Sequence, residues 1–415
     1  MRVPFSYHEA RQPHMTSRQR ILAAINHRPV DRVPVDFGGT RQSGISAYAY
    51  APLRKHLQTP APEPMRIFDL FQMLAEIEPR VAARFGADCV ALHRPAVAFG
   101  LSNAQYKTYR FDGIDEDALV PADFSPVTDA AGDLVLQRAG AVIARMPRGG
   151  FYFDRFEKYP GATHPDLATF SPPRLGAADL RHYEMASRHL FDETDKAVIA
   201  ALGPPYELFN GIGQGGFEEW MMTFASEDDY VRALYDKLVD TWIENLIAFQ
   251  RAVGDRVHIL QIADDFGTQH APFLSEAMFR DKLLPAYRRG LDWIHNHTGW
   301  KVMLHSDGAI FPLLDAIVEM GVDILNPVQT TADGMDARRL HERYGGKLVF
   351  WGGSCDCQNT LTYGTSQQVA AEVRENLRIF RPSDGGYVFA PVHNVQANVP
   401  PQNVAALFDT ALGFL

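Results

Sequence analysis

A histidine and an aspartate stand two residues apart in the stretch His305-Ser-Asp-Gly308. On an extended chain, side chains two positions apart point to the same face, so the imidazole of His305 and the carboxylate of Asp307 can reach one metal ion. Gly308 then lets the backbone turn into a following helix. The alternative is structural: His305 would bond to the backbone at a strand end, and Asp307 would cap a helix that begins near Ile310.

A second histidine follows the last apolar run of the chain, in Pro391-Val-His-Asn-Val-Gln396. Taken alone, His393 is more often a structural residue. Two histidines and a carboxylate at strand ends that open into one mouth favour a shared zinc site instead. Further polar and thiol side chains end apolar runs and belong to the same candidate set: Asp36, Arg41, Asn210, Gln214, Asp264, Asp265, Asn326, Gln329, Cys355, Asp356, Cys357 and Gln396.

Adjacent carboxylates follow the buried run Val257–Ala263, as Asp264 and Asp265. Neighbouring side chains on an extended chain point in opposite directions, so at most one of the two naturally faces the mouth. That residue could act as a base or orient a metal-bound histidine. The structural alternative is a helix cap.

Two of the three cysteines flank an aspartate in Cys355-Asp-Cys357. Alternation would place both thiols on one side and Asp356 on the other, so the pair could chelate a soft metal. The spacing is not Cys-x-x-Cys, which disfavours a thioredoxin-like redox pair. A single Cys-x-Cys is a weak zinc motif, and we keep Cys355 as the ligand that would complete the site if Asp307 points away.

The glycine-rich stretch Gly38-Gly-Thr-Arg-Gln-Ser-Gly44 lacks the lysine and the spacing of a nucleotide phosphate loop. Arg41 could instead bind a substrate carboxylate with two parallel hydrogen bonds. The alternative is a loop with a solvated arginine.

The segments that must position these residues repeat one pattern: an apolar run, a polar or glycine-rich turn, and a helix. Helices are expected over 275–295, 311–320, 335–344 and 366–380, between the apolar runs of the C-terminal half. This alternation indicates parallel strands covered by helices. Polar residues end many different strands and no Gly-x-Gly-x-x-Gly follows the first one, which favours a single α/β TIM-type (β/α)8 barrel over an open doubly wound sheet.

Residues 105–160 depart from this pattern, because they alternate apolar and polar side chains and turn at glycines. They predict an antiparallel β insertion that forms a lid or rim. Residues 1–15 are expected to be a polar N-terminal extension, and 16–415 a single barrel domain. Exposed barrel helices and the insertion could support a homodimer.

The composition narrows the classes of function. The chain has 415 residues, 46% hydrophobic and 22% charged, which suits a large buried core. Its net charge of -10 argues against a dedicated nucleic-acid binder. No apolar run is long enough to span a bilayer, the N-terminus lacks a secretory h-region, and three cysteines make no disulfide framework. A cytoplasmic location is therefore expected.

Several motifs together resemble the uroporphyrinogen decarboxylase superfamily. They include Thr16-Ser-Arg-Gln-Arg-Ile-Leu-Ala-Ala-Ile, Asp31-Arg-Val-Pro-Val, His305-Ser-Asp-Gly, Gly321-Val-Asp-Ile-Leu-Asn-Pro and Pro391-Val-His. The resemblance covers roughly 16–415 and implies a (β/α)8 barrel. True uroporphyrinogen decarboxylases carry Met-Arg-Gln-Ala-Gly-Arg near the N-terminus, whose arginines bind substrate carboxylates. The matching stretch, 37–44, holds one arginine, so the resemblance is closer to the other branch, the corrinoid-linked methyltransferases.

In that branch the zinc motif is His-x-Cys followed by a distant Cys. It falls here on His305, Asp307 and His393, a harder set of ligands that favours activation of an oxygen over binding of a thiolate. The resemblance therefore implies zinc-dependent demethylation of a small methoxylated substrate. No Asp-x-His-x-x-Gly cobalamin motif occurs, so a corrinoid would belong to a separate partner protein.

The resulting hypothesis assigns zinc to His305, Asp307 and His393, with Cys355 in reserve. Catalytic roles fall to Asp36, Asp264 and Asp265. Substrate binding falls to Arg41, Asn210, Gln214, Gln329 and Gln396. Two alternatives stay open: a decarboxylase or lyase that needs no metal, in which Asp36, the aspartate pair and His393 stabilise a protonated intermediate, and a barrel that binds a ligand without turnover.

Overall fold

The computed structural model describes residues 14–59, 63–96, 98–156, 164–211 and 216–414. Seven parallel strands form its central sheet, in the order β16-β15-β14-β13-β12-β11-β4. Their bounds are Cys89–Leu92 (β4), Ala197–Ala201 (β11), Ile259–Ala263 (β12), Lys301–His305 (β13), Ile324–Asn326 (β14), Val349–Trp351 (β15) and Tyr387–Val388 (β16).

The segment 33–37 closes this sheet into a barrel. On one side, the amide of Asp36 donates to the carbonyl of Phe389 at 2.8 Å, next to a parallel bridge between Val35 and Phe389. On the other side, the amide of Asp88 donates to the carbonyl of Val35 at 2.7 Å. The segment thus takes the place of an eighth parallel strand, and the TIM-type α/β barrel expected from the sequence is confirmed.

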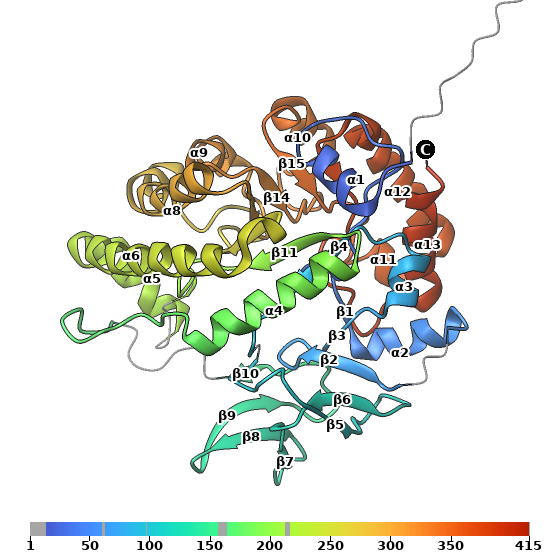
Figure 1. Cartoon of the computed structure of the whole chain (residues 1–415), viewed down its shortest axis with the longest axis horizontal. Helices are drawn as coiled ribbons and strands as arrows, with labels where there is room; N and C mark the ends of the chain where they lie inside the picture. The colour runs from blue at the N-terminus through green and yellow to red at the C-terminus, as the bar shows by residue number, and fades with distance from the viewer. Residues whose placement is uncertain (1–13, 60–62, 97, 157–163, 212–215, 415) are drawn as a thin grey trace, which may run out of the picture.

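Helices surround the sheet, as Figure 1 shows. Their starts follow local sequence: Thr16 and Thr365 both cap a helix and form a capping box with a glutamine three residues on. The bounds are Ser17–Ala24 (α1), Ala47–His56 (α2), Pro79–Arg84 (α3), Ala177–Glu193 (α4), Phe217–Ser226 (α5), Asp228–Val253 (α6), Glu276–Met278 (α7), Leu284–His297 (α8), Leu314–Met320 (α9), Ala337–Tyr344 (α10), Thr360–Tyr363 (α11), Ser366–Phe380 (α12) and Pro401–Leu412 (α13). Among the described residues, no helix combines the length and the apolar character needed to cross a membrane.

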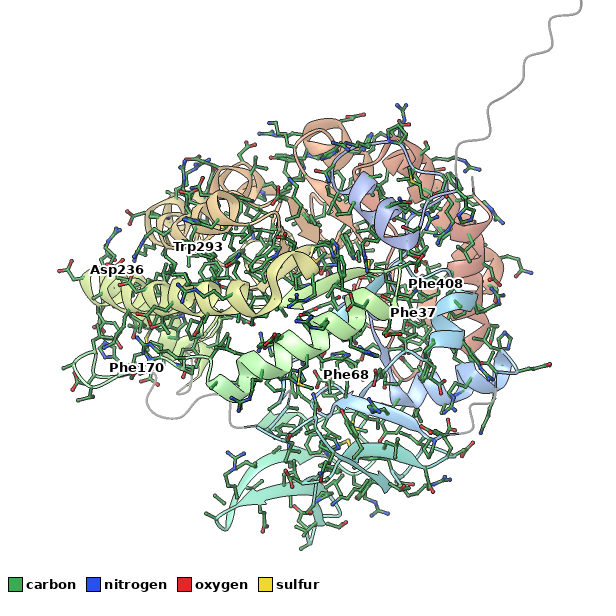
Figure 2. The ribbon with its side chains drawn as sticks, in the orientation of Figure 1. Phe37, Phe68, Phe170, Asp236, Trp293 and Phe408 are labelled. Atoms are coloured by element: carbon green, nitrogen blue, oxygen red, sulfur yellow. The ribbon has the colours of Figure 1, made fainter. Side chains whose placement is uncertain are left out.

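Two further sheets of mostly antiparallel strands form a separate layer beside the barrel, at the bottom of Figure 1, and β2 and β6 are the pair that runs parallel. They begin earlier in the chain than the expected insertion at 105, because β1 to β3 join the same layer. The bounds are Ile45–Ser46 (β1), Met65–Asp69 (β2), Leu74–Ala75 (β3), Tyr106–Tyr109 (β5), Ala118–Pro121 (β6), Val127–Thr128 (β7), Leu134–Arg138 (β8), Ala141–Met146 (β9) and Arg155–Phe156 (β10). In Figure 2, Phe68 lies where this layer meets the barrel, and its ring centroid is 4.4 Å from that of His93.

The barrel interior is filled by apolar side chains and sealed at one end by α1. Ile21 and Ala24 of that helix, with Ile25 at its C-cap, pack against a buried cluster that includes Ile259, Met303, Ile324 and Val349 from successive strands. Outside the barrel, Phe37 packs on Phe408 of α13, with ring centroids 4.6 Å apart (Figure 2). Because α1 covers this end, we expect a site in the lumen at the carboxyl ends of the strands.

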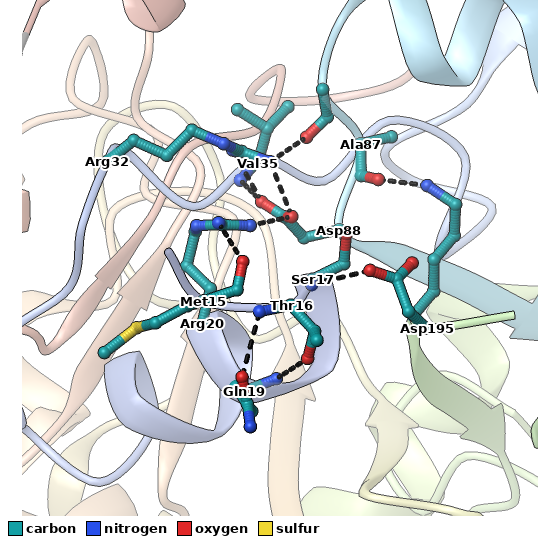
Figure 3. A network of polar contacts seen from close by, with 12 residues as sticks. Met15, Thr16, Ser17, Gln19, Arg20, Arg32, Val35, Ala87, Asp88 and Asp195 are labelled. Atoms are coloured by element: carbon teal, nitrogen blue, oxygen red, sulfur yellow. Dashed lines mark hydrogen bonds and ion pairs between the residues drawn. The ribbon is translucent and has the colours of Figure 1, made fainter. Parts of the chain in front are cut away.

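A buried charge network fixes α1 in this position (Figure 3). Asp88, fully buried at the start of β4, accepts hydrogen bonds from Arg20 at 2.7 Å and from Arg32 at 2.8 and 2.9 Å. Its carboxylate also accepts from the amide of Val35 at 3.0 Å. Arg20 pairs in addition with Asp31 at 2.6 Å. Because every oxygen of Asp88 is used, the buried charge is compensated and ties the closing strand to β4.

Candidate active site

Two polar residues stand directly above the apolar filling of the lumen. Met303 and Ile324 face inward, so the residues two positions later, His305 and Asn326, face inward as well. The register pairs His305 with Asn326 across β13 and β14. The two side chains therefore meet at the same height, where the lumen opens.

Asn326 fixes how the ring of His305 is oriented. Its Nδ2 donates to the carbonyl of Trp351 at 3.1 Å, which leaves its Oδ1 as an acceptor for Nδ1 of His305 at 2.8 Å. Nδ1 of His305 must therefore carry a proton, and Nε2 of the neutral ring carries the lone pair. The exposed fraction of His305 is only 5%.

Asp307 and His393 complete a cluster around that nitrogen. Oδ2 of Asp307 lies 3.5 Å from Nε2 of His305 and 3.9 Å from Nε2 of His393. One ligand atom from each of the three residues lies within 4.8 Å of the others. Two imidazoles and a carboxylate at this separation can converge on one divalent ion.

The loop after β13 is held so that Asp307 points into the cluster. Its amide donates to Oδ1 of Asp265 at 3.0 Å, and the amide of Gly308 donates to Oε1 of Gln329 at 2.9 Å. Gly308 has a φ of +93°, and a Cβ there would lie 2.4 Å from the carbonyl carbon of Gly267. Only glycine fits this turn.

Burial and the neighbouring charges shift the pKa values of the two histidines in opposite directions. Burial acts to lower the pKa of His305, but the Asp307 carboxylate and, more weakly, Asp265 outweigh it and raise the pKa to about 9. Burial lowers the pKa of His393. Although burial opposes it, contact with His305 keeps the pKa of Asp307 below its usual range. His305 is thus either an imidazolium paired with Asp307 or, when a metal takes the place of the proton, a neutral ligand.

The cluster borders a cavity of about 580 Å³. Gln329 and Gln396, both expected to bind substrate, line this cavity together with Asp307 and His393. Gln329 also donates to Gln269 at 3.0 Å, whereas Gln396 donates to the backbone carbonyl of Asn394 at 3.1 Å. The structure therefore brings five of the expected residues to one side of the mouth.

The three aspartates that were expected to be catalytic make different contacts. Asp265 supports the Asp307 backbone. Asp264 is buried and accepts from the amide and side chain of Asn210, the amide of Phe209 and the hydroxyl of Tyr287, at 2.7 to 2.9 Å. Burial raises the pKa of Asp264 to about 8, against the effect of these donors. Its carboxylate faces residues 209–210 and does not line the cavity of the cluster.

Asp36 is likewise withdrawn from the cavities. It is fully buried and accepts from Nε1 of Trp351 at 2.8 Å and from the amide of Gly39 at 2.7 Å. Burial raises its pKa to about 6. Both oxygens hold neighbouring segments together, and Asp36, which was expected to be catalytic, lines neither of the two cavities at the barrel mouth.

The remaining expected substrate ligands divide into three cases. Arg41 lines a second cavity, near β4, and forms an ion pair with Asp69 of β2. Asn210 turns away, since its side chain bonds Asp264 and the carbonyl of Asp265. Gln214 lies outside the described residues.

The loop after β15 separates its two thiols. Cys355 is buried and its Sγ lies 3.5 Å from Oε2 of Glu372, so it does not reach the cluster and is not a ligand there. Asp356 accepts from the amides of Gln358 and Asn359 at 2.8 and 3.1 Å, within its own loop. Cys357 is the residue of the three that lines the cavity of the cluster. Positive φ angles at Gly352 and Gly353, +112° and +68°, precede this loop, so the alternation of an extended chain does not apply.

Sequence reasoning missed Arg94, which lines the second cavity. It follows the apolar run of β4 by two residues, so the rule that polar residues at strand ends face the mouth could have found it. No local sequence pattern indicates that Asp69 pairs with Arg41, because this contact depends on how the β2 layer packs against the barrel.

Comparisons with known proteins agree with this fold. A family model described as "Uroporphyrinogen decarboxylase (URO-D)" matches residues 154–413. A uroporphyrinogen decarboxylase of Xanthomonas euvesicatoria is 24% identical over 95% of this chain and 98% of its own. A chloroplastic uroporphyrinogen decarboxylase 2 of rice is 23% identical, and the match spans only 53% of each chain. A solved structure described as a methyltransferase from Methanosarcina mazei superposes with a TM-score of 0.58 at 18% identity, covering 96% of this chain and 98% of that one.

Proposed function

This chain belongs to the uroporphyrinogen decarboxylase family, and from that premise we propose that it is a zinc-dependent methyltransferase. It would take a methyl group from a small methoxylated substrate and pass it to a corrinoid carried by a separate protein. One observation carries the proposal: the convergence of His305, Asp307 and His393 on a cavity at the barrel mouth. Its fold is shared with a protein described as a methyltransferase.

The donor set suits a catalytic zinc site. Structural zinc sites usually have four protein ligands, whereas catalytic sites have three and leave a position for substrate or water. Here Asp307 and His393 line a cavity and His305 lies beside them, which would leave that position accessible from the cavity. The Nδ1–H···Asn326 bond presents Nε2 of His305 to the ion, as an outer hydrogen-bond partner does for most metal-bound histidines.

The protein's own residues would bind and orient the substrate. Gln329 and Gln396 border the cavity and offer amide groups to a polar substrate. Asp265 holds the backbone of Asp307 in place. When bound, zinc would supply Lewis-acid polarisation of the substrate oxygen. The C–O bond would break with its electron pair left on the oxygen, a reduced Co(I) corrinoid on the partner protein would supply the electron pair of the new bond to the methyl group, and the oxygen would take up a proton.

Metal analysis of the purified protein tests the proposal. We expect about one equivalent of zinc per chain, and loss of most of it in His305→Ala and His393→Ala. His341→Ala is the matched control, because His341 lies on α10 outside the cluster. Zinc content that is the same in all four proteins, or absent from all, would refute the assignment.

A decarboxylase that needs no metal is the second candidate. The curated relatives are named uroporphyrinogen decarboxylases, and the pKa of His305, raised to about 9 chiefly by Asp307 against burial, makes this histidine a proton donor in the mouth. In that reaction the C–C bond to the carboxylate breaks, carbon dioxide leaves, and the carbon that keeps the electron pair is protonated. Release of carbon dioxide from a carboxylate substrate after chelator treatment, without any corrinoid, would favour this candidate.

A further inference from the structure

A second cavity, of about 190 Å³, opens at the carboxyl ends of β4, β11 and β12. Its lining shares no residue with the His305–Asp307–His393 cluster or with the cavity that borders it. Leu92, Ile199 and Ala263 provide apolar walls, and Phe68 of the antiparallel layer provides another. The cavity is therefore a separate compartment of the same mouth, with surfaces suited to an apolar or aromatic body.

Arg94 brings a positive charge into this compartment. Its Nε donates to the backbone carbonyl of Ala201 at 3.3 Å. Within the described parts of the chain, no carboxylate lies within ion-pair distance of its guanidinium. Arg41, the other arginine of the lining, is paired with Asp69 instead. A guanidinium that faces a cavity without a counter-ion can bind a carboxylate through two parallel hydrogen bonds.

The charge balance of the compartment selects a monoanion. Asp69 offsets the charge of Arg41, so Arg94 is the arginine of the described lining that has no ion-pair partner and can bind a ligand's charge. Glu207 also borders the cavity, and its carboxylate repels a dianion more strongly than a monoanion. A phosphate dianion is therefore a poorer fit than a carboxylate.

We propose that this compartment binds the carboxylate of the substrate, with Arg94 as its counter-ion. Only the identity of the ligand rests on the proposed function. If the protein is a demethylase, its methyl donor is a methoxylated monocarboxylic acid. Arg94 follows β4 and His305 ends β13, three strands away in the sheet. At about 4.8 Å per strand, that is about 14 Å along the curved wall and less across the mouth. A substituted aromatic acid, together with the length of an arginine side chain, can bridge this gap.

Equilibrium binding to the full-length protein tests the proposal. Calorimetric titrations would compare acetate, benzoate and 4-methoxybenzoate with the neutral probes acetamide and benzamide. They would be run after chelator treatment and without corrinoid, so that the result does not depend on methyl transfer. We expect carboxylates to bind more tightly than amides, and Arg94→Gln to weaken benzoate binding about 10- to 100-fold. Arg94→Lys should retain part of the affinity, since it keeps the charge without the planar pair of donors.

Arg232→Gln is the matched control, because Arg232 lies on α6 and pairs with Asp281 at the outer surface. It should bind benzoate as the unmodified protein does, and circular dichroism would verify that each variant is folded. Three outcomes overturn the proposal: equal binding of benzoate and benzamide, unchanged benzoate binding in folded Arg94→Gln, or no binding of any of the three carboxylates. Tighter binding of inorganic phosphate than of benzoate would overturn it as well. If the carboxylates bind as expected but no methyl transfer is found, the proposed function fails and this inference stands.

Discussion

Replacing Asn326 by alanine should weaken metal binding without touching a ligand. Asn326 is buried, accepts from Nδ1 of His305 at 2.8 Å and donates to the carbonyl of Trp351 at 3.1 Å. Loss of such an outer partner typically costs about 10- to 100-fold in metal affinity, or about 1.4–2.7 kcal/mol. The same change leaves a buried donor and a buried acceptor without partners, each at a cost of about 1–3 kcal/mol to folding.

Competition between the protein and a zinc-sensitive chelator dye would measure the affinity, and urea denaturation the free energy of unfolding. Asn245→Ala is the matched control. Asn245 is also buried, with one accepted bond of 2.9 Å and one donated bond of 3.2 Å, but it lies on α6 and contacts the segment 173–175. We expect comparable destabilisation in both variants and weaker zinc binding only in Asn326→Ala. Equal zinc affinities in the two variants would refute the orienting role of Asn326.

Three further predictions concern folding. Gly308→Ala should destabilise the protein by about 3 kcal/mol or more and lower its zinc content, because the added Cβ would collide with Gly267; unchanged urea midpoint and metal content would contradict this. Asp88→Asn should cost about 3–5 kcal/mol in the same denaturation assay, since it removes the counter-charge between two arginines, whereas a loss under 1 kcal/mol would show that Arg20 is satisfied by its other partner. His258 has its pKa lowered from 6.5 to about 4 by burial and by Arg18, so the unfolded chain binds the extra proton first and stability should fall by about 3 kcal/mol as the pH drops from 6.5 to 4. His258→Asn should flatten that part of the stability profile; an identical slope in both proteins would assign the acid sensitivity elsewhere.

The parts of this fold that follow from local rules could be predicted from the sequence. The helix expected over 366–380 coincides with α12, whose cap and capping box are written in consecutive residues. The cluster was predictable for a related reason. His305 and Asp307 are two apart after a buried strand, and parallel strands deliver their ends to one mouth, which brings in His393 from β16's side of the barrel.

The predictions that differ from the structure depend on contacts between residues far apart in the sequence or on a change in backbone conformation. Cys355 was expected to share a face with Cys357, but the left-handed glycines before the loop end the extended conformation, and the first thiol turns toward Glu372. Asp36 stands at a strand end as expected, yet Trp351 of β15, two strands away in the sheet, donates to its carboxylate. Neither contact partner is close in sequence, so no pattern of spacing could reveal it.

The two candidate functions differ in the state of one atom. Asn326 keeps a proton on Nδ1 of His305 in either case, because its Oδ1 can only accept. Nε2 therefore holds either a metal or a second proton, and Asp307 at 3.5 Å stabilises both. A metal there makes His305 a ligand and directs chemistry to an oxygen of the substrate. A proton there makes it a general acid, suited to protonating carbon after carbon dioxide leaves. The carboxylate compartment at Arg94 serves either reaction, so the occupant of Nε2 determines which bond of a bound acid is broken.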